Sequence, residues 1–146
     1  MTARSALQQA GFAGSALDVA LGVSWAESGG YSDAVGDWKV VDPSQPEYNP
    51  DAAVKWGPSI GLFQVRSLKY PHAWGLADSH REVFALRNVW YNAVAAYAIS
   101  KQGTDWTPWT VYRTGSYLPH IGKDYVIQTG HAVAAKWRLG TVTPAA

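Results

Sequence analysis

The chain has 146 residues, enough for one domain with a sizeable core and hardly enough for two. Hydrophobic residues make up 47% and charged residues 16%, a composition that is typical of a globular domain and argues against disorder. The formal net charge is +1 and no run of Lys or Arg occurs, so the sequence predicts no nucleic-acid partner and no polyanionic ligand. The absence of Cys excludes disulfides and thiolate chemistry.

Aromatic residues are the unusual part of the composition. Eight Trp and eight Tyr stand against three Phe. Trp and Tyr combine an apolar face with a polar group, which suits surfaces that bind the flat faces of sugar rings. Because any single Trp is more often a core residue, composition alone leaves both roles open.

The first part of the chain predicts two helices. Residues 2–10 form the first, which Gly11 ends, and Ser15 with Asp18 resembles a capping box that opens the second. Apolar and small side chains recur in the second helix at steps of three and four, up to Glu27, and Gly29 is expected to end it.

Glu27 is therefore expected near the buried face at the C-terminal end of an apolar helix. The negative end of the helix dipole and the loss of water beside neighbours such as Val23 both disfavour the anion, so we expect a raised pKa. A carboxyl group that keeps its proton near neutral pH is suited to general acid catalysis.

Residues 30–60 show no helical period and contain four prolines, three glycines and five acidic residues. A segment of this length without a regular element predicts a functional loop. Within it, Trp38–Val41 is expected to form one arm of a small hairpin, and residues 61–67 are expected to form a helix or short turn beneath the loop.

The second half predicts further helices. Ser79 and Glu82 resemble a second capping box, whose helix Asn88 interrupts and restarts, running to about Lys101. The other expected elements are a short helix over residues 109–113 after a Thr-Pro pair, a last helix over residues 122–139, and a tail or linker start over residues 141–146. Residues 1–140 are thus expected to form one domain, with neither a signal peptide nor a membrane span.

Four motifs occur in an order that resembles a known family. They are Glu27-Ser28-Gly29-Gly30, then Gly61-Leu62-Phe63-Gln64-Val65, then Asn92 followed by Ala93, Ala95, Ala96 and Tyr97, and finally the aromatic segment 106–117. The order is similar to that of lysozyme-like lytic transglycosylases and goose-type lysozymes. Within that superfamily the chain most resembles the glycosidase domains of actinobacteriophage endolysins and virion-associated lysins. The resemblance covers about residues 11–121.

The resemblance implies a mainly α, α+β lysozyme-like fold, in which a helical domain and a small irregular or β-hairpin lobe form a cleft. It also implies cleavage of the β-1,4 bond between N-acetylmuramic acid and N-acetylglucosamine in peptidoglycan, without cofactor or metal. Glu27 matches the residue that acts first as acid and then as base. Gln64 and Tyr112 match substrate-contacting residues, and Asn92 matches an asparagine that binds substrate or holds the loop, the second being favoured.

Further candidates for substrate contact are Ser59, close to the Gln64 motif, and the loop aromatics Tyr31, Trp38 and Trp56. Asp33 and Asp37 are candidates for a second carboxylate among the loop acids. A hydrolase that activates water needs such a group, whereas a lytic transglycosylase closes an anhydro ring with the muramoyl 6-hydroxyl and does not. The sequence leaves both products open.

Two other classes of protein compete with this hypothesis. A non-catalytic glycan-binding or virion module would use the aromatics and leave Glu27 without a role. A metal-dependent amidase would need His72, His80, His120 and His131, which lack a recognisable metal spacing. As a phage lysin, the chain would be a monomer, fused or not to a wall-binding or second catalytic domain. It would reach the wall from the host cytoplasm through a separate pore protein, or with the virion.

Overall fold

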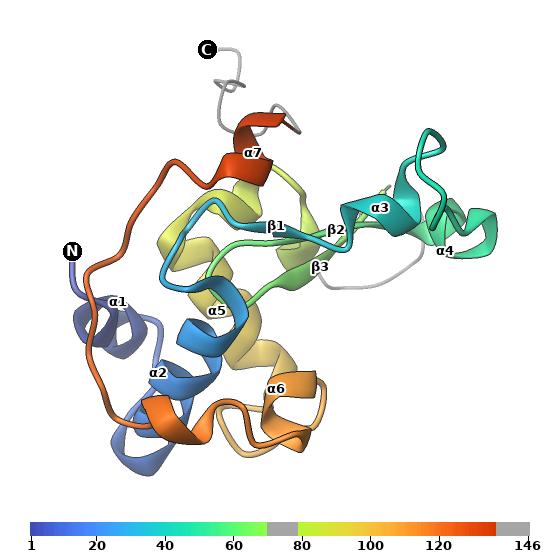
Figure 1. The fold of residues 1–146 in the computed structure, drawn as a ribbon. Helices are drawn as coiled ribbons and strands as arrows, with labels where there is room; N and C mark the ends of the chain where they lie inside the picture. The colour runs from blue at the N-terminus through green and yellow to red at the C-terminus, as the bar shows by residue number, and fades with distance from the viewer. Residues whose placement is uncertain (70–78, 137–146) are drawn as a thin grey trace.

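The structure is a computed structural model of the chain, and it describes residues 1–69 and 79–136. Figure 1 shows helices on one side and a small sheet on the other, from which two short helices project. The elements are α1 (Ala3–Gln9), α2 (Gly14–Ser28), β1 (Val35–Gly36), α3 (Trp38–Val41), α4 (Pro50–Lys55), β2 (Trp56–Ile60), β3 (Val65–Leu68), α5 (Val89–Ile99), α6 (Thr110–Arg113) and α7 (Ala132–Lys136). The 3₁₀ turns are Ser79–Arg81, Ala85–Arg87 and Leu118–His120.

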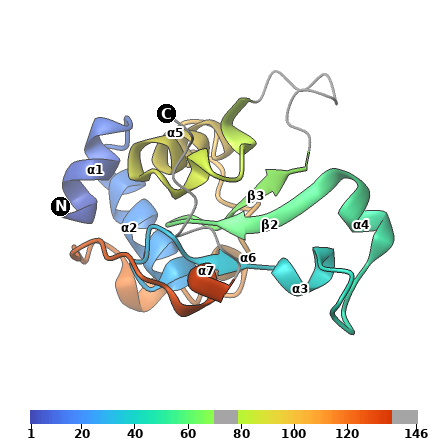
Figure 2. The ribbon, with the colours of Figure 1, turned by 90° about the horizontal axis from the view of Figure 1, so that it is seen from above.

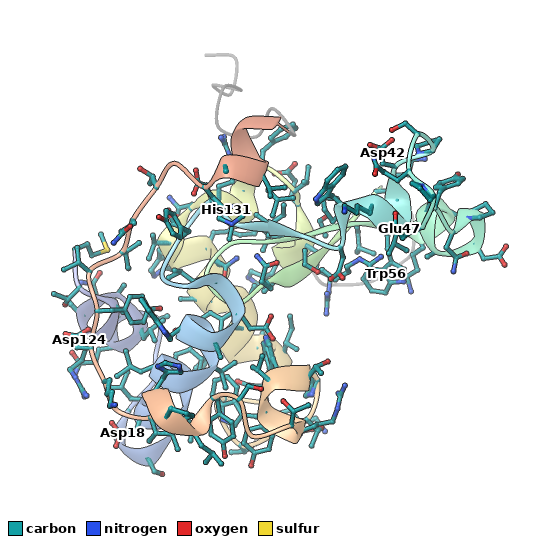
Figure 3. All side chains as sticks on the ribbon, viewed as in Figure 1. Asp18, Asp42, Glu47, Trp56, Asp124 and His131 are labelled. Atoms are coloured by element: carbon teal, nitrogen blue, oxygen red, sulfur yellow. The ribbon has the colours of Figure 1, made fainter. Side chains whose placement is uncertain are left out.

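The central helix α2 carries Leu17, Leu21 and Val23 into the core, each 3% exposed or less. Gly29 ends it in the left-handed conformation, with φ 62°, as the sequence predicts. The predicted capping box is wrong, because Ala13 is the N-cap and no side chain caps the helix. Asp18 (Figure 3) instead lies 3.6 Å from the Arg4 guanidinium.

Helix α5 begins where Asn88 caps it, with the Asn88 Oδ1 accepting from the Tyr91 N–H at 3.0 Å. The predicted restart at Asn88 is confirmed. Before it, the expected regular helix is wrong, since the chain forms two 3₁₀ turns. Glu82 serves the second of these turns, because its carboxylate accepts from the Ala85 N–H at 2.6 Å.

The three strands form an antiparallel sheet in the order β1-β2-β3. The expected hairpin arm over Trp38–Val41 is wrong, because this segment is the helix α3. Asp37 takes a left-handed conformation, with φ 55°, and turns the chain out of the sheet directly before α3. Of the segment 61–67, which the sequence predicts to form a helix or short turn, residues 61–64 form a tight turn and the rest belongs to β3. Seen from above (Figure 2), α3 and α4 lie away from the helical side.

The predicted last helix over residues 122–139 is also wrong within the described residues. Residues 123–131 are not helical, and isolated bridges pair Thr2 with Val126 and Tyr31 with Gln128. Side chains 125–128 alternate between half-buried and exposed, which is the two-residue period of an extended chain. Only α7 is helical, and residues 137–146, including the expected tail, lie outside the described residues.

An aromatic cluster joins the helical side to the turn between β2 and β3. Phe63 stacks with Phe12 and Trp106, at ring-centroid distances of 5.9 and 6.2 Å, and packs edge-on against Trp109. The Trp109 indole N–H also donates to the Phe63 carbonyl at 2.8 Å. Trp106 and Trp109 are therefore core residues. The fold is the α+β arrangement that the sequence predicts, with helices and a small lobe. Among the described helices, none is long and apolar enough to cross a membrane.

Candidate active site

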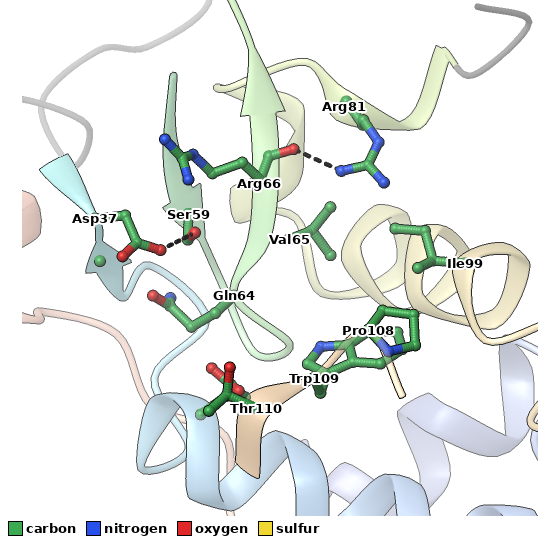
Figure 4. Close-up of a pocket in the computed structure, with 12 residues that line it drawn as sticks. Asp37, Ser59, Gln64, Val65, Arg66, Arg81, Ile99, Pro108, Trp109 and Thr110 are labelled. Atoms are coloured by element: carbon green, nitrogen blue, oxygen red, sulfur yellow. Dashed lines mark hydrogen bonds between the residues drawn. The ribbon is translucent and has the colours of Figure 1, made fainter. Parts of the chain in front are cut away.

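A cavity of about 430 Å³ lies where the sheet, the end of α2 and the start of α6 meet (Figure 4). It is lined by Glu27, Gly36, Asp37, Ser59, Gln64, Val65, Arg66, Arg81, Ile99, Pro108, Trp109 and Thr110. The lining carries carboxylates, guanidinium groups, two hydroxyls and an amide, so it is suited to a large polar ligand.

Glu27 is the last residue but one of α2 and is half-buried at the cavity. Burial raises the pKa of Glu27 to about 7, and the negative charge of Asp37 adds to the shift. The pKa of Glu27 is thus raised, as the sequence predicts. The neighbouring Asp37 carboxylate is a second cause of the shift, and the sequence does not predict it.

Asp37 and Ser59 come together through the sheet register, which pairs Gly36 of β1 with Ser59 of β2. The buried Ser59 hydroxyl donates to the Asp37 Oδ2 at 2.6 Å (Figure 4) and so orients the carboxylate. Of the two predicted second carboxylates, the structure brings only Asp37 to the cavity of Glu27. Asp33 is buried elsewhere, where its carboxylate accepts from the backbone N–H groups of Gly130 and His131 at 2.8 and 3.2 Å.

Gln64 lines the cavity at the end of the tight turn, where its φ is 50°. Its amide nitrogen donates to the carbonyls of Ala34 and Gly61, each at 3.1 Å, so the side chain is held by backbone. A Cβ at Gly36 would collide with the Gln64 Oε1, so this packing requires glycine. Gln64 Oε1 remains as an acceptor for a ligand hydroxyl or N–H group.

Asn92 lies in the core, 1% exposed, beneath the same turn. Its Oδ1 accepts from the Phe63 N–H at 3.0 Å, and its amide nitrogen donates to the carbonyls of Ile60 and Leu86 at 2.8 and 2.9 Å. A Cβ at Gly61 would collide with this amide. Of the two roles that the sequence left open for Asn92, the contacts are those of a residue that holds the loop.

The remaining predicted contact residues do not line the cavity: Tyr31, Trp38, Trp56 and Tyr112. Tyr31 packs edge-on against His131, and Tyr112 stacks on Tyr117 with ring centroids 4.9 Å apart. Trp38 is half-buried and packs against the core. Tyr31, Trp38 and Tyr112 thus pack against other side chains of the protein. The Trp56 ring lies near the guanidinium groups of Arg66 and Arg81, which line the cavity.

Sequence reasoning missed Arg66 and Arg81, which line the cavity together (Figure 4). The Arg66 Nε donates to the Gly57 carbonyl at 2.6 Å, and the Arg81 Nη1 donates to the Arg66 carbonyl at 2.9 Å. Each is a single basic residue in its own segment. No sequence signal joins them, because only the sheet and the 3₁₀ turn Ser79–Arg81 bring them together.

The histidines that a metal site would need lie in different surroundings. His80 packs near Tyr91, His120 near Trp25 and His131 near Tyr31, while His72 lies outside the described residues. Within residues 1–69 and 79–136, no group of three or more His, Cys, Asp or Glu side chains could hold a metal ion.

The family described as a lysozyme-like domain matches residues 4–111, a range that includes Glu27, Asp37, Gln64 and Arg66. The chain belongs to the lysozyme-like domain family. Membership of this family supports assignment of the chain to the broad class of peptidoglycan-cleaving enzymes. It also implies peptidoglycan as the substrate. Comparisons with curated proteins and with solved structures give no match.

Proposed function

We propose that this protein cleaves the β-1,4 bond between N-acetylmuramic acid and N-acetylglucosamine in peptidoglycan, with Glu27 as general acid and then general base. The observation that carries the proposal is the raised pKa of Glu27, about 7, at a polar cavity that also holds Asp37. A carboxyl group with this pKa is protonated in a large fraction of molecules at neutral pH and can still donate its proton.

In the proposed reaction, Glu27 protonates the glycosidic oxygen as the bond from the muramoyl C1 to that oxygen breaks. The developing oxocarbenium charge lies in a cavity that contains the Asp37 carboxylate. If the muramoyl 6-hydroxyl attacks C1, its proton passes to the ionised Glu27 and the product is an anhydro sugar. If water attacks C1, Asp37 accepts its proton, Glu27 regains a proton from solvent, and the product has a reducing end. Mass spectrometry of the digested wall distinguishes the two.

Replacement of Glu27 by Gln tests the assignment. The amide keeps the size of the side chain and cannot donate the proton, so lysis of purified cell walls should fall by about 10²–10⁴-fold. Binding to the walls should persist, which separates an enzyme from a non-catalytic binding module. Glu47→Gln is the matched control, because Glu47 lies exposed between α3 and α4 (Figure 3). Unchanged lysis by the Glu27→Gln variant would remove Glu27 from the mechanism.

We further propose that the protein acts as a phage lysin. Support comes from the resemblance of segment 106–117 to the closing segment of actinobacteriophage lysins. In this proposal residues 1–140 are the catalytic unit, and residues 141–146 are a tail or lead to a further domain. The enzyme works as a monomer, made in the host cytoplasm and released through a separate pore protein, or carried by the virion. Lysis of host cells only on coexpression with a pore protein would support the first route.

A further inference from the structure

Two guanidinium groups occupy one end of the cavity. Figure 4 shows Arg66 and Arg81 at the end opposite Trp109 and Thr110. The uncharged sugar units of a glycan strand offer no negative charge to such a wall, and the proposed acid chemistry makes no use of it. Neither the glycan nor the acid chemistry therefore accounts for a cationic wall at this end of the cavity.

Arg66 has unused hydrogen-bonding capacity at this wall. Its Nε is bonded to the Gly57 carbonyl, whereas its Nη2 is buried and has no hydrogen-bond partner among the described residues. Within the same part of the chain, no carboxylate forms an ion pair with Arg66. Because a buried cationic N–H group without an acceptor is costly, a bound acceptor would be favoured.

The guanidinium groups are also held in place. The Trp56 ring centroid lies 5.9 Å from the Arg66 Cζ and 5.5 Å from the Arg81 Cζ. The Arg81 Nη1 donates to the Arg66 carbonyl and ties its turn to β3. A guanidinium fixed in this way loses little conformational freedom when it binds an anion.

We propose that Arg66, with Arg81 beside it, binds a carboxylate of the peptidoglycan stem peptide while the glycan lies at Glu27. This inference rests on the proposed function. In the intact wall the muramoyl lactyl group is amide-bonded to the peptide, so the carboxylates near the glycan belong to the stem. Carboxylate is the group that a guanidinium binds best, through two parallel N–H donors. The enzyme would then prefer strands that carry charged stems.

The test compares two substrates: soluble glycan strands whose stem carboxylates are free, and the same strands after chemical amidation of those carboxylates. Arg66→Met keeps an apolar side chain beside Trp56 and removes the charge. We expect it to lower kcat/KM on the charged strands by about 10-fold or more, mainly through KM. Amidation should lower kcat/KM of the wild type by a similar factor. On the amidated strands, the variant and the wild type should be equal.

Lys55→Met is the matched control. Its Nζ lies 5.0 Å from the Trp56 ring centroid, but Lys55 is not among the described residues that line the cavity. It should therefore behave as the wild type on both substrates. An equal loss of kcat/KM by Arg66→Met on charged and amidated strands would overturn the inference. Arg66 would then affect cleavage without binding a stem carboxylate.

The wild type alone gives a second test that does not depend on the folding of a variant. Equal cleavage of charged and amidated strands by the wild type would also overturn the inference. Glu27→Gln separates this failure from failure of the proposed function. If Glu27→Gln loses cleavage of both substrates, the proposed function stands whatever the stem preference. If it keeps cleavage of both, the proposed function falls, and the inference falls with it.

Discussion

At the scale of single residues, the proton of Glu27 is controlled mainly by its burial at the end of α2. Asp37 contributes the second part of the shift, across the cavity from a different element. Ser59 orients Asp37 through a 2.6 Å hydrogen bond. The two carboxyl groups thus lie in different environments, and this difference is what the proposed division into an acid and a second carboxylate requires.

This arrangement predicts the pH dependence of cleavage. In the proposed mechanism only the protonated form of Glu27 starts the reaction, so kcat/KM of the wild type should fall above about pH 7, by about tenfold for each pH unit. Asp37→Asn removes a negative charge that raises the pKa of Glu27, so the alkaline limb should move to lower pH. The limb should remain above that of an ordinary carboxyl group, because burial, the larger cause, is unchanged.

The measurement is the pH profile of kcat/KM for the wild type, Asp37→Asn and the Glu47→Gln control. Only Asp37→Asn should shift the profile. An alkaline limb that stays in place in Asp37→Asn would show that Asp37 does not act on the proton of Glu27. A loss of rate without a shift would leave Asp37 as a group that acts in the chemical step alone.

At the scale of elements, Asn92 connects α5 to the turn that carries Gln64. Three hydrogen bonds tie its side chain to the backbone of Ile60, Phe63 and Leu86. Ile60 is the last residue of β2 and Phe63 lies in the turn, so these bonds fix the turn against the end of β2. The position of Gln64 in the cavity therefore depends on a buried residue that does not line it.

Asn92→Ala should lower the free energy of unfolding by about 2–4 kcal/mol, because it leaves buried backbone groups without partners. It should also lower activity. Asn88→Ala is the control: it removes one exposed N-cap of the same helix and should cost about 1 kcal/mol with activity retained. Denaturant unfolding and wall lysis provide the two readouts. A cost for Asn92→Ala no larger than that for Asn88→Ala would refute this role.

Elements with strong local signals could be predicted from the sequence. Gly29 and Asn88 mark the end of α2 and the start of α5 through their own backbone preferences. The extended conformation of segment 123–131 could not be predicted, because its backbone bonds with residues far away in the sequence. The Ala3 N–H donates to the Tyr125 carbonyl, and the Ile127 N–H donates to the Met1 carbonyl. Long-range pairing overrode a helical pattern there. At α3, the left-handed Asp37 overrode the β-propensity of the valines.

The residues of the candidate site also differ in whether a local motif predicts them. Glu27, Ser59 and Gln64 lie in or beside local motifs, and all three line the cavity. Arg66 and Arg81 come from segments without a motif, and the sheet register with a 3₁₀ turn assembles them. Of the loop aromatics, Tyr31 and Trp38 pack against protein and do not line the cavity, and their contact with substrate stays a prediction.

At the scale of the whole molecule, the cavity lies where the helical side meets the sheet. The cluster of Phe12, Phe63, Trp106 and Trp109 joins the two, and Trp109 both packs in this cluster and lines the cavity. The candidate site and the core packing therefore share Trp109. The range matched by the lysozyme-like domain family spans α1 to the start of α6 and contains every residue that lines the cavity.

The most direct test of the account is a ¹³C NMR titration of the Glu27 side-chain carboxyl in the intact protein. The chain's glutamates are Glu27, Glu47 and Glu82, so selective labelling gives a simple spectrum, and the Glu27→Gln variant identifies the resonance of Glu27. The account predicts a titration midpoint near pH 7. A midpoint near 4.5, the ordinary value for this carboxyl, would contradict it.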